Sequence, residues 1–463
     1  MQHLDYDVAV IGGGAAGVAA AIAAAKTGAS TIVVDAGPML GGELLSGMSI
    51  DGALNARGEW VVKGVSDEIY EECRAMDGFI GPLCDYRLIS YICCDPEVMK
   101  IAIARVLARH NVTVLLYTHA TEVVTKDGRV SSVVLQSKNR KTLLSAKYFV
   151  DASGDGDVAA MAGAPFEFSD ESGDLQPVSL MFRMSGVENE PFLDFVRDNS
   201  ASLAVGESDY LRGDRSDDDL AQLIHDQGEP TVFFRGNGPF LGGAIQRGDM
   251  PPTALIMIMP TSKSRKEVCV NATRVAENID GTHAIEVSRA VPVLLEQVWQ
   301  TVSFLKKRCP GFENASFAGV APRVGIRETR RIMGEDIITG EDCKTGRKRP
   351  DVITKGAHHI DIHGDGIKQV RIQIPDGGSY DIGWRTLIPQ KLSNVVLAGR
   401  CMSSTREANG TTRMMGQCLG TGHAAGTAAA MSIAAGHTDI RQLPLESLQS
   451  KLREQGAILE GTH

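Results

Sequence analysis

Long apolar runs, basic tracts and paired cysteine motifs are missing from this sequence. No apolar stretch approaches the ~20 residues of a membrane helix, and no export signal precedes the first predicted strand. The nine cysteines are scattered, and even the adjacent Cys93 and Cys94 lack the spacing of zinc or iron–sulfur sites. A formal charge of −10 without a Lys/Arg-rich tract argues against nucleic acid or an anionic membrane as partner. We therefore expect a cytoplasmic protein with reduced thiols and no bound metal.

The composition is that of an ordinary globular protein, with 43% hydrophobic and 22% charged residues. A chain of 463 residues exceeds what one hydrophobic core usually serves, so we expect two interleaved domains. Low-complexity segments are absent. The only internal similarity joins AAGVAAA at residues 15–21 to AAGTAAA at residues 424–430, near the two ends of the chain.

The first of these segments belongs to a β-α-β unit. An apolar strand leads into Gly12-x-Gly14-x-x-Gly17, and a helix rich in small residues is followed by the strand TIVVD. Gly12 permits a tight turn, Gly14 lets backbone N–H groups approach a pyrophosphate, and Gly17 lets the helix pack closely on the strand. Asp35 ends the second strand, where it can accept the hydroxyls of an adenosine ribose. The unit predicts a dinucleotide site.

The second segment lies in GTGHAAG at residues 420–426, which also fits the glycine pattern. Its surroundings differ, because the apolar strand NVVLAG at residues 394–399 ends well before it and no strand ending in an acid follows. We therefore exclude a second nucleotide-binding domain. The N-terminus of this helix can instead stabilise the negative charge at the pyrimidine edge of a reduced flavin. The alternative is a helix packed on a sheet without a ligand.

Further segments, in this order along the chain, carry a resemblance to a known family. They are GGGAAG at 12–17, GGELLSG at 41–47, FVDASGDGDVAAMAGAPFE at 149–167, QPVSLMFRMSGV at 176–187, GIRETRRIMGEDIITGED at 325–342, IDIHG at 360–364 and the stretch at 387–430. The sequence resembles the FAD-dependent oxidoreductase family, whose fold is the glutathione-reductase type of Rossmann flavoprotein. It is distantly similar to the flavoproteins of fumarate reductase and succinate dehydrogenase.

The resemblance implies an α/β fold in which a substrate domain is inserted into an FAD-binding domain. The FAD-binding domain, with a parallel sheet and a small antiparallel sheet, would comprise residues 1–165 and 387–440. An α+β substrate domain would comprise residues 166–386, where TALIMIMP and EVCVNATRV alternate like strands and a long helix is interrupted by Pro292. Residues 441–463 would form a C-terminal helix or tail.

The resemblance also implies noncovalently bound FAD, and it assigns the contacts residue by residue. These are Gly12, Gly14, Ala15, Ala16, Asp35 and Ala36 in the ADP-binding turn; Gly41, Gly42, Glu43, Ser46 and Gly47 along the pyrophosphate and ribityl chain; Ala120 and Thr121 at adenine; Ala152, Ser153, Gly154 and Asp157 in the second nucleotide motif; and Gly399, Arg400, Gly410, Met415, Gly416 and Gln417 in the closing flavin loop.

The sequence departs from the family pattern at two places. Where many relatives read T-H-E-A, residues 405–408 read T-R-E-A, so the acid/base role of that histidine cannot be carried over. Arg400 stands where many flavoproteins of this fold have an aspartate on the ribityl chain. Cys401 and Cys418 flank this loop, and their alternatives are packing, covalent flavin attachment or a redox role.

Residues that could bind substrate and move protons form three groups. They are Arg323, Arg327, Arg330 and Arg331; His358, His359 and His363; and Arg406 and Arg413. Arginine suits carboxylate recognition, and histidine suits proton transfer near neutral pH. We select Arg327 and Arg406 as substrate ligands and His363 as the acid/base. The alternatives are interface ion pairs for the arginines and a structural role for the histidine. His359 and His363 lack a third metal ligand.

The predicted function is that of an FAD-dependent oxidoreductase. It would transfer a hydride between flavin N5 and a small oxygenated metabolite, anionic or neutral. Two alternatives stay open: an NAD(P)H-dependent flavin monooxygenase, and an FAD-binding subunit of an electron-transfer complex. The sequence specifies neither the electron acceptor nor whether the protein forms a homo-oligomer, because the motifs describe FAD and not the substrate.

Overall fold

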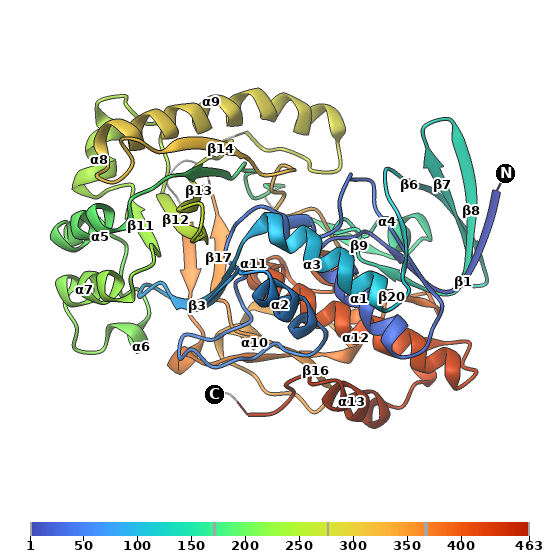
Figure 1. Cartoon of the computed structure of the whole chain (residues 1–463). Helices are drawn as coiled ribbons and strands as arrows, with labels where there is room; N and C mark the ends of the chain where they lie inside the picture. The colour runs from blue at the N-terminus through green and yellow to red at the C-terminus, as the bar shows by residue number, and fades with distance from the viewer. Residues whose placement is uncertain (1, 170–172, 276, 365–368, 462–463) are drawn as a thin grey trace.

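The structure is a computed structural model that describes residues 2–169, 173–275, 277–364 and 369–461. Segments from the two ends of the chain lie side by side in it. In Figure 1 the blue N-terminal and red C-terminal elements form one half, and the green and yellow elements from the middle of the chain form the other. The chain therefore leaves the first half, builds the second and returns.

A mostly parallel sheet forms the centre of the first half. Its strands run in the order β5-β2-β1-β8, and β20 lies parallel to the end of β8. The antiparallel strands β7 and β6 continue the sheet from the other part of β8. The strands of this sheet are β1 (Gln2–Ile11), β2 (Thr31–Val34), β5 (Thr113–Leu115), β6 (His119–Lys126), β7 (Arg129–Ser137), β8 (Arg140–Asp151) and β20 (Val395–Leu397). A mostly parallel sheet covered by helices confirms the α/β class that the sequence analysis predicts.

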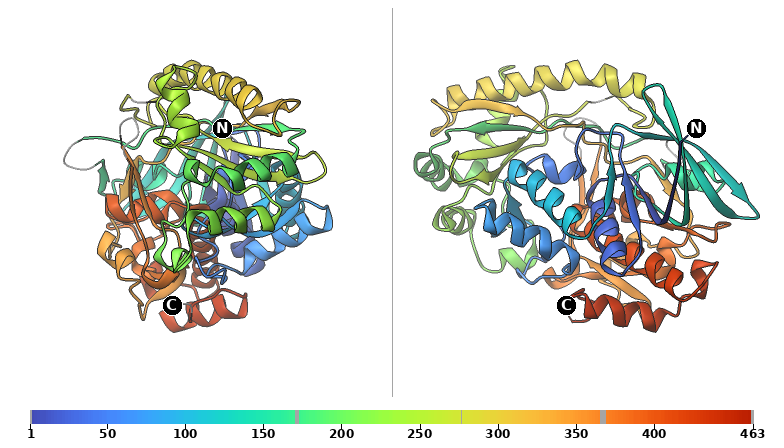
Figure 2. Two further views of the ribbon diagram at one scale, coloured as in Figure 1. Left: turned by 90° about the vertical axis from the view of Figure 1, so that its left-hand side faces the viewer. Right: turned by 45° about the vertical axis from the view of Figure 1, so that its right-hand side comes forward.

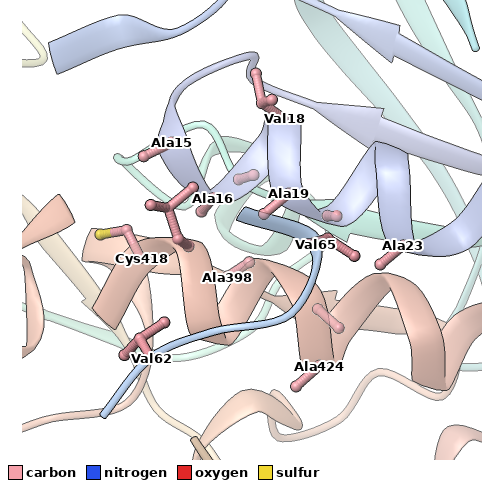
Figure 3. Packing of buried hydrophobic residues seen from close by; sticks show 14 of the residues in the cluster. Ala15, Ala16, Val18, Ala19, Ala23, Val62, Val65, Ala398, Cys418 and Ala424 are labelled. Atoms are coloured by element: carbon pink, nitrogen blue, oxygen red, sulfur yellow. The ribbon is translucent and has the colours of Figure 1, made fainter. Parts of the chain in front are cut away.

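Two helices built from small residues cover this sheet. Helix α1 (Ala15–Lys26) contains the first alanine-rich segment and α12 (Met415–Ala434) contains the second. The similar segments therefore pack against each other, as Figure 3 shows for Ala16 and Ala19 of α1 above Ala424 of α12.

Backbone meets backbone where these helices cross. A methyl group added at Gly422 would lie 2.0 Å from the carbonyl oxygen of Ala16, and one added at Gly426 would lie 2.1 Å from that of Ala20. These distances leave no room for any side chain, so glycine is required at both positions. The glycine pattern that imitates a nucleotide fingerprint is thus a helix-packing motif.

An antiparallel sheet with the order β11-β12-β13-β10-β14 forms the second half. Helix α9 (Ala284–Arg308) runs along it at the top of Figure 1, and Figure 2 shows it from two further sides. The other elements are β10 (Phe182–Ser185), α5 (Asn189–Asp198), α6 (Asp209–Arg212), α7 (Asp217–Gln227), β11 (Val232–Arg235), α8 (Pro239–Gln246), β12 (Leu255–Ser262), β13 (Glu267–Asn271) and β14 (Ser316–Val320).

Helix α9 continues through Pro292, where the sequence predicts an interruption. Proline removes one backbone hydrogen bond from a helix and crowds the preceding turn. Pro292 lies on the exposed side of α9, where water can satisfy the released carbonyl group. The helix therefore tolerates it.

The apolar core of the second half is built from residues 178–321, apart from the core around α1 and α12. The predicted substrate domain extends to residue 386, but Ile338, Ile353, Ile382 and Trp384 belong to the core of the first half. They lie in or beside α10 (Gly340–Lys344) and two pairs of antiparallel strands. The outer pair is β16 (Val352–Gly356) with β19 (Tyr380–Gly383), and the pair between them along the chain is β17 (Ile360–His363) with β18 (Gln369–Ile372).

The last helix, α13 (Leu445–Glu454), buries Leu448 and Leu452 against the region of α12 and β16. Across the described residues, no helix is both long enough and apolar enough to span a membrane. The elements not yet named are α2 (Val65–Ala75), β3 (Phe79–Cys84), β4 (Ser90–Cys94), α3 (Pro96–Arg109), α4 (Asp157–Met161), β9 (Phe166–Phe168), β15 (Arg330–Ile332) and α11 (Arg406–Thr412).

The close contact of α1 and α12 predicts that Gly426→Ala destabilises the protein. Alanine favours an isolated helix by about 1 kcal/mol over glycine, but here the added methyl group collides with backbone and should cost about 1–3 kcal/mol net. Gly243→Ala in α8, where the methyl group meets only the tip of Arg247, is the matched control. Melting temperatures measure both. A melting temperature for Gly426→Ala at or above wild type would contradict the prediction.

Candidate active site

A cavity of about 630 Å³ lies between the two halves of the molecule. The N-terminal ends of α1 and α12 open into it from the first half, and residues of β12 and β13 line it from the second. Segments far apart in the sequence thus meet at one site, as the chain path in Figure 1 allows.

Two glycines at the entrance of α1 have different tasks. A methyl group at Gly12 would lie 2.3 Å from the carbonyl oxygen of Ala152, so Gly12 allows the strand and the loop to touch. A methyl group at Gly14 would meet no atom within 4 Å and would stand in the cavity. Gly14 caps α1, and no described side chain caps the first turn. Its free backbone N–H groups suit a pyrophosphate.

Asp35 is fixed by backbone groups beside this turn. Its carboxylate accepts hydrogen bonds from the N–H groups of Gly13 and Gly37, each at 2.6 Å. The guanidinium of Arg323 approaches the same carboxylate at 3.6 Å from the second half of the molecule. All of these groups except Gly13 line the cavity. Asp35, the carboxylate that we predict to bind the ribose, therefore lines the part of the cavity beside the N-terminus of α1.

The segment at Gly399 and Arg400 and the start of α12 also line the cavity, and Gly399 lies directly against Ala16 of α1. Gly399 has a positive φ of 78°, Arg400 follows, and Met415 begins the helix. The Arg400 guanidinium binds the carboxylate of Asp155 at 2.9 Å, and both side chains line the cavity. The side chain at position 400, where the sequence departs from the family pattern, is thus held by an ion pair with Asp155.

Most of the predicted FAD contacts line this one cavity. They are Gly12, Gly14, Ala15, Ala16, Asp35, Ala36, Gly42, Glu43, Ala152, Ser153, Gly154, Gly399, Arg400 and Met415. The others lie behind the lining or away from it. They are Gly41, Ser46, Gly47, Ala120, Thr121, Asp157, Gly410, Gly416 and Gln417.

The residues away from the lining have contacts of their own. Gln417 is buried and hydrogen-bonds to Tyr380 and Thr411, so it holds the start of α12. Asp157 forms an ion pair with Arg330 at 2.8 Å. Ala120 and Thr121 lie on β6, outside the cavity.

The predicted substrate ligands separate in the structure. Arg327 and His363 line the cavity, whereas Arg406 does not. Nε of Arg406 binds the buried carboxylate of Glu328 at 3.1 Å, and Arg331 binds the same carboxylate at 3.0 Å. Arg406 therefore has the interface ion pair that the sequence analysis gives as the alternative, because α11 directs it toward Glu328.

Arg327 and Arg413 are partly buried cations that face the cavity. Arg327 donates to the carbonyl oxygen of Pro177 and forms no ion pair within the described residues. Burial and repulsion from Arg413 and Arg274 lower the pKa of Arg327 to about 9, so it stays charged at neutral pH. Burial also lowers the pKa of Arg413, whose Nε has no hydrogen-bond partner in the described part of the chain. Two cationic side chains therefore face the same cavity.

Carboxyl groups that the sequence analysis overlooked also line the cavity. Burial raises the pKa of Asp51 to about 7 and that of Asp85 to about 6. The carboxyl of Asp51 accepts a hydrogen bond from the hydroxyl of Ser49 at 2.6 Å. The sequence signal for Asp51 is a single acid in the otherwise uncharged stretch SGMSIDGAL, directly after the predicted pyrophosphate loop.

Part of the cavity lining is apolar. Its side chains are Met48, Leu88, Phe233, Leu255 and Met257.

Cys418 also reaches the cavity, but burial raises its thiol pKa to about 12, so it is not a thiolate at neutral pH. Cys401 is buried outside the lining. The described residues contain no group of three His, Cys, Asp or Glu side chains arranged to hold a metal ion.

The hydrogen-bonding groups along the cavity fit FAD. Asp35 suits the ribose, the free N–H groups of α1 suit the pyrophosphate, and the start of α12 suits the pyrimidine edge of the ring. A family model described as FAD-dependent oxidoreductase matches residues 7–452. The chain belongs to the FAD-dependent oxidoreductase family. It is an enzyme, and FAD is its cofactor.

Solved structures with a similar chain path include three proteins of low sequence identity. A geranylgeranyl bacteriochlorophyll reductase-like protein from Thermoplasma acidophilum is 14% identical, with 98% of this chain and 85% of that chain covered and a TM-score of 0.46. A flavoprotein/dehydrogenase from Cytophaga hutchinsonii is 13% identical, with 96% and 82% covered and a TM-score of 0.45. The p-nitrophenol 4-monooxygenase of Pseudomonas putida DLL-E4 is 12% identical, with 99% and 84% covered and a TM-score of 0.42.

The open space around Gly14 predicts a selective effect of Gly14→Ala on FAD binding. The residue has φ −72° and ψ −167°, which alanine adopts without strain, so the melting temperature of the apoprotein should not change. The methyl group would crowd the pyrophosphate and should raise the Kd for FAD about 10- to 100-fold. Flavin fluorescence measures the Kd, with Gly243→Ala as control. Wild-type FAD affinity in Gly14→Ala would contradict this placement.

Proposed function

We propose that this enzyme transfers a hydride between flavin N5 and a small oxygenated metabolite that carries a carboxylate. The observation that carries the proposal is the pair of partly buried guanidinium groups of Arg327 and Arg413 at the cavity wall. The substrate is thus expected to be anionic, which narrows the prediction from the sequence.

The free energy of burial supports an anionic substrate. A buried charge without a partner is costly, and proteins normally pair it. Arg331 and Arg406 follow that rule through Glu328, whereas Arg327 forms no ion pair in the described chain. An arginine left this way is suited to a ligand carboxylate, which its planar fork can bind through two hydrogen bonds.

The surrounding residues explain how such a substrate would be oriented. Arg327 and Arg413 hold its carboxylate, and the apolar wall around Phe233 and Met257 excludes water from its remaining atoms. The first-turn N–H groups of α12 favour negative charge at the pyrimidine edge of the flavin ring. Bound FAD supplies the two-electron hydride chemistry.

Arg327→Ala and Arg413→Ala should each lower kcat/KM for the carboxylate substrate at least about 30-fold. Each removes one partner of a buried charge pair, which typically costs 2–5 kcal/mol. The measurement is anaerobic bleaching of the FAD absorbance with a panel of 2-hydroxy acids and dicarboxylic acids. Arg289→Ala, at an exposed position of α9, is the control.

Arg406→Ala separates the two interpretations of Arg406. The ion pair with Glu328 predicts a lower melting temperature, while a role as substrate ligand predicts a higher KM in a protein of wild-type stability.

Neutral analogues that bleach FAD faster than the acids would contradict the proposed function. Rapid reduction by NAD(P)H, followed by a flavin hydroperoxide on addition of oxygen, would instead support a monooxygenase.

A further inference from the structure

Two carboxyl groups of the cavity, those of Asp51 and Asp361, lie in opposite environments. Asp361 accepts hydrogen bonds from Nε2 of His363 at 2.7 Å and from the amide of Gln369 at 2.5 Å. Burial opposes its ionisation, but the contact with His363 and the charge of Arg413 hold the pKa of Asp361 well below its ordinary value. Asp361 is therefore a fixed carboxylate.

The ring of His363 is locked by its two neighbours. Its Nδ1 lies 2.9 Å from a guanidinium nitrogen of Arg274. A guanidinium can only donate, so Nδ1 accepts and the ring proton lies on Nε2, which donates to Asp361. Burial lowers the pKa of His363 to about 3, against the opposing effect of Asp361. Both ring nitrogens are engaged, which makes His363 a positioning residue for Asp361 and leaves the proton-transfer role to another group.

The tautomer of His358 points to that group. Its Nδ1 lies 2.6 Å from the carbonyl oxygen of His359, so Nδ1 carries the proton and Nε2 has a free lone pair. This Nε2 lies 3.7 Å from Oδ2 of Asp51, while Oδ1 of Asp51 accepts from Ser49. Burial lowers the pKa of His358 to about 4, so the ring is neutral. An acceptor therefore faces Oδ2, the position at which Asp51 can hold a proton.

Charged and titratable groups face Asp51 from every side. Asp85 and Asp361 disfavour its ionised form, Arg413 favours it, and the hydrogen bond from Ser49 favours it as well. Tyr91 and the thiol of Cys93 on β4, and His358 after β16, also face Asp51. The phenol of Tyr91 has no hydrogen-bond partner among the described residues, and like Asp51 it lines the cavity.

We propose that Asp51 is the catalytic acid/base, the residue that exchanges with the substrate the proton that accompanies hydride transfer. The proposal rests on the proposed function and assigns its proton-transfer step. Asp51 lines the same cavity as the anion-binding arginines, and its neighbours place it between the protonated and ionised states. In many active sites, two carboxyl groups whose pKa values are pushed apart by different environments act in different roles, one as a fixed charge and one as the acid/base.

The step balances for oxidation of an alcohol. The O–H bond of the substrate breaks and its proton passes to the carboxylate of Asp51. The C–H bond breaks with its electron pair, which leaves as hydride to FAD, and the carbon–oxygen double bond forms. The substrate is oxidised by two electrons and FAD is reduced by two. Asp51 releases the proton to solvent before the next turnover.

An infrared titration of the FAD-loaded protein tests Asp51 without any substrate. The wild-type protein should show the C=O band of a protonated carboxyl group that disappears as the pH rises through about 7. Asp51→Asn should lose this transition and keep only the band of carboxyl groups that titrate at lower pH, such as Asp85 with its pKa of about 6, whereas His363→Gln should keep the transition. Absence of the transition near pH 7 in wild type, or its persistence in Asp51→Asn, would overturn the proposal.

The pH dependence of flavin bleaching by the active 2-hydroxy acid tests the role in catalysis. Oxidation needs the Asp51 carboxylate, so the rate should rise with pH through about 7 and then level off. Asp51→Asn should abolish the rise and lower the rate about 10²- to 10⁴-fold. Ser49→Ala removes a hydrogen bond to the carboxylate and should move the rise to higher pH. A purely structural role of Asp51 would give no such shift.

The two proposals fail in different ways. If no acid in the panel bleaches FAD in the wild-type protein, the proposed function is wrong, and the infrared titration still decides the protonation of Asp51. If bleaching occurs with a pH dependence that Asp51→Asn and Ser49→Ala leave unchanged, the assignment of Asp51 is wrong while the proposed function stands.

Discussion

Glycine and alanine let α1 and α12 approach until backbone meets backbone, and the position of both helix ends at the cavity depends on that contact. Because a methyl group at Gly422 or Gly426 would collide with α1, the helices cannot slide apart or rotate without losing the fit. Their N-termini therefore open into one cavity at a fixed separation. The similar segments at the two ends of the chain are partners in this contact, which explains the similarity without a second nucleotide site.

The sequence predicts the first part of this arrangement because its signals are local. Gly12, Gly14 and Asp35 lie within a single β-α-β unit, where spacing fixes geometry, and the structure brings all three to the cavity. The segment at 338–386 gives no such signal. Its strand pairs are short, and only tertiary packing determines that they belong to the apolar core of the first half and not to that of the second. The same holds for Pro292, whose effect depends on which side of α9 meets water.

Charged residues of the site could be predicted by type and not by role. Arg406 and Arg413 lie seven positions apart around one short helix, and the sequence does not say which faces the cavity. The buried Glu328 takes Arg406, and Arg413 remains for the cavity. Histidine is the usual choice for proton transfer near neutral pH, but that choice assumes a free ring nitrogen. In His363 the guanidinium of Arg274 occupies that nitrogen with a hydrogen bond, and Arg274 is 89 positions away in the sequence.

The contrast between Asp51 and Asp361 shows why residue type is a poor guide to protonation in a buried site. Both are aspartates on the wall of one cavity, and burial disfavours the charge of each. Asp361 receives N–H donors from two side chains, whereas Asp51 receives one hydroxyl and faces the bare nitrogen of His358. The difference follows from the tautomers of two histidines, each set by a group bound to its Nδ1. A guanidinium at one ring and a carbonyl oxygen at the other thus divide two chemically identical carboxyl groups into a fixed charge and a proton carrier.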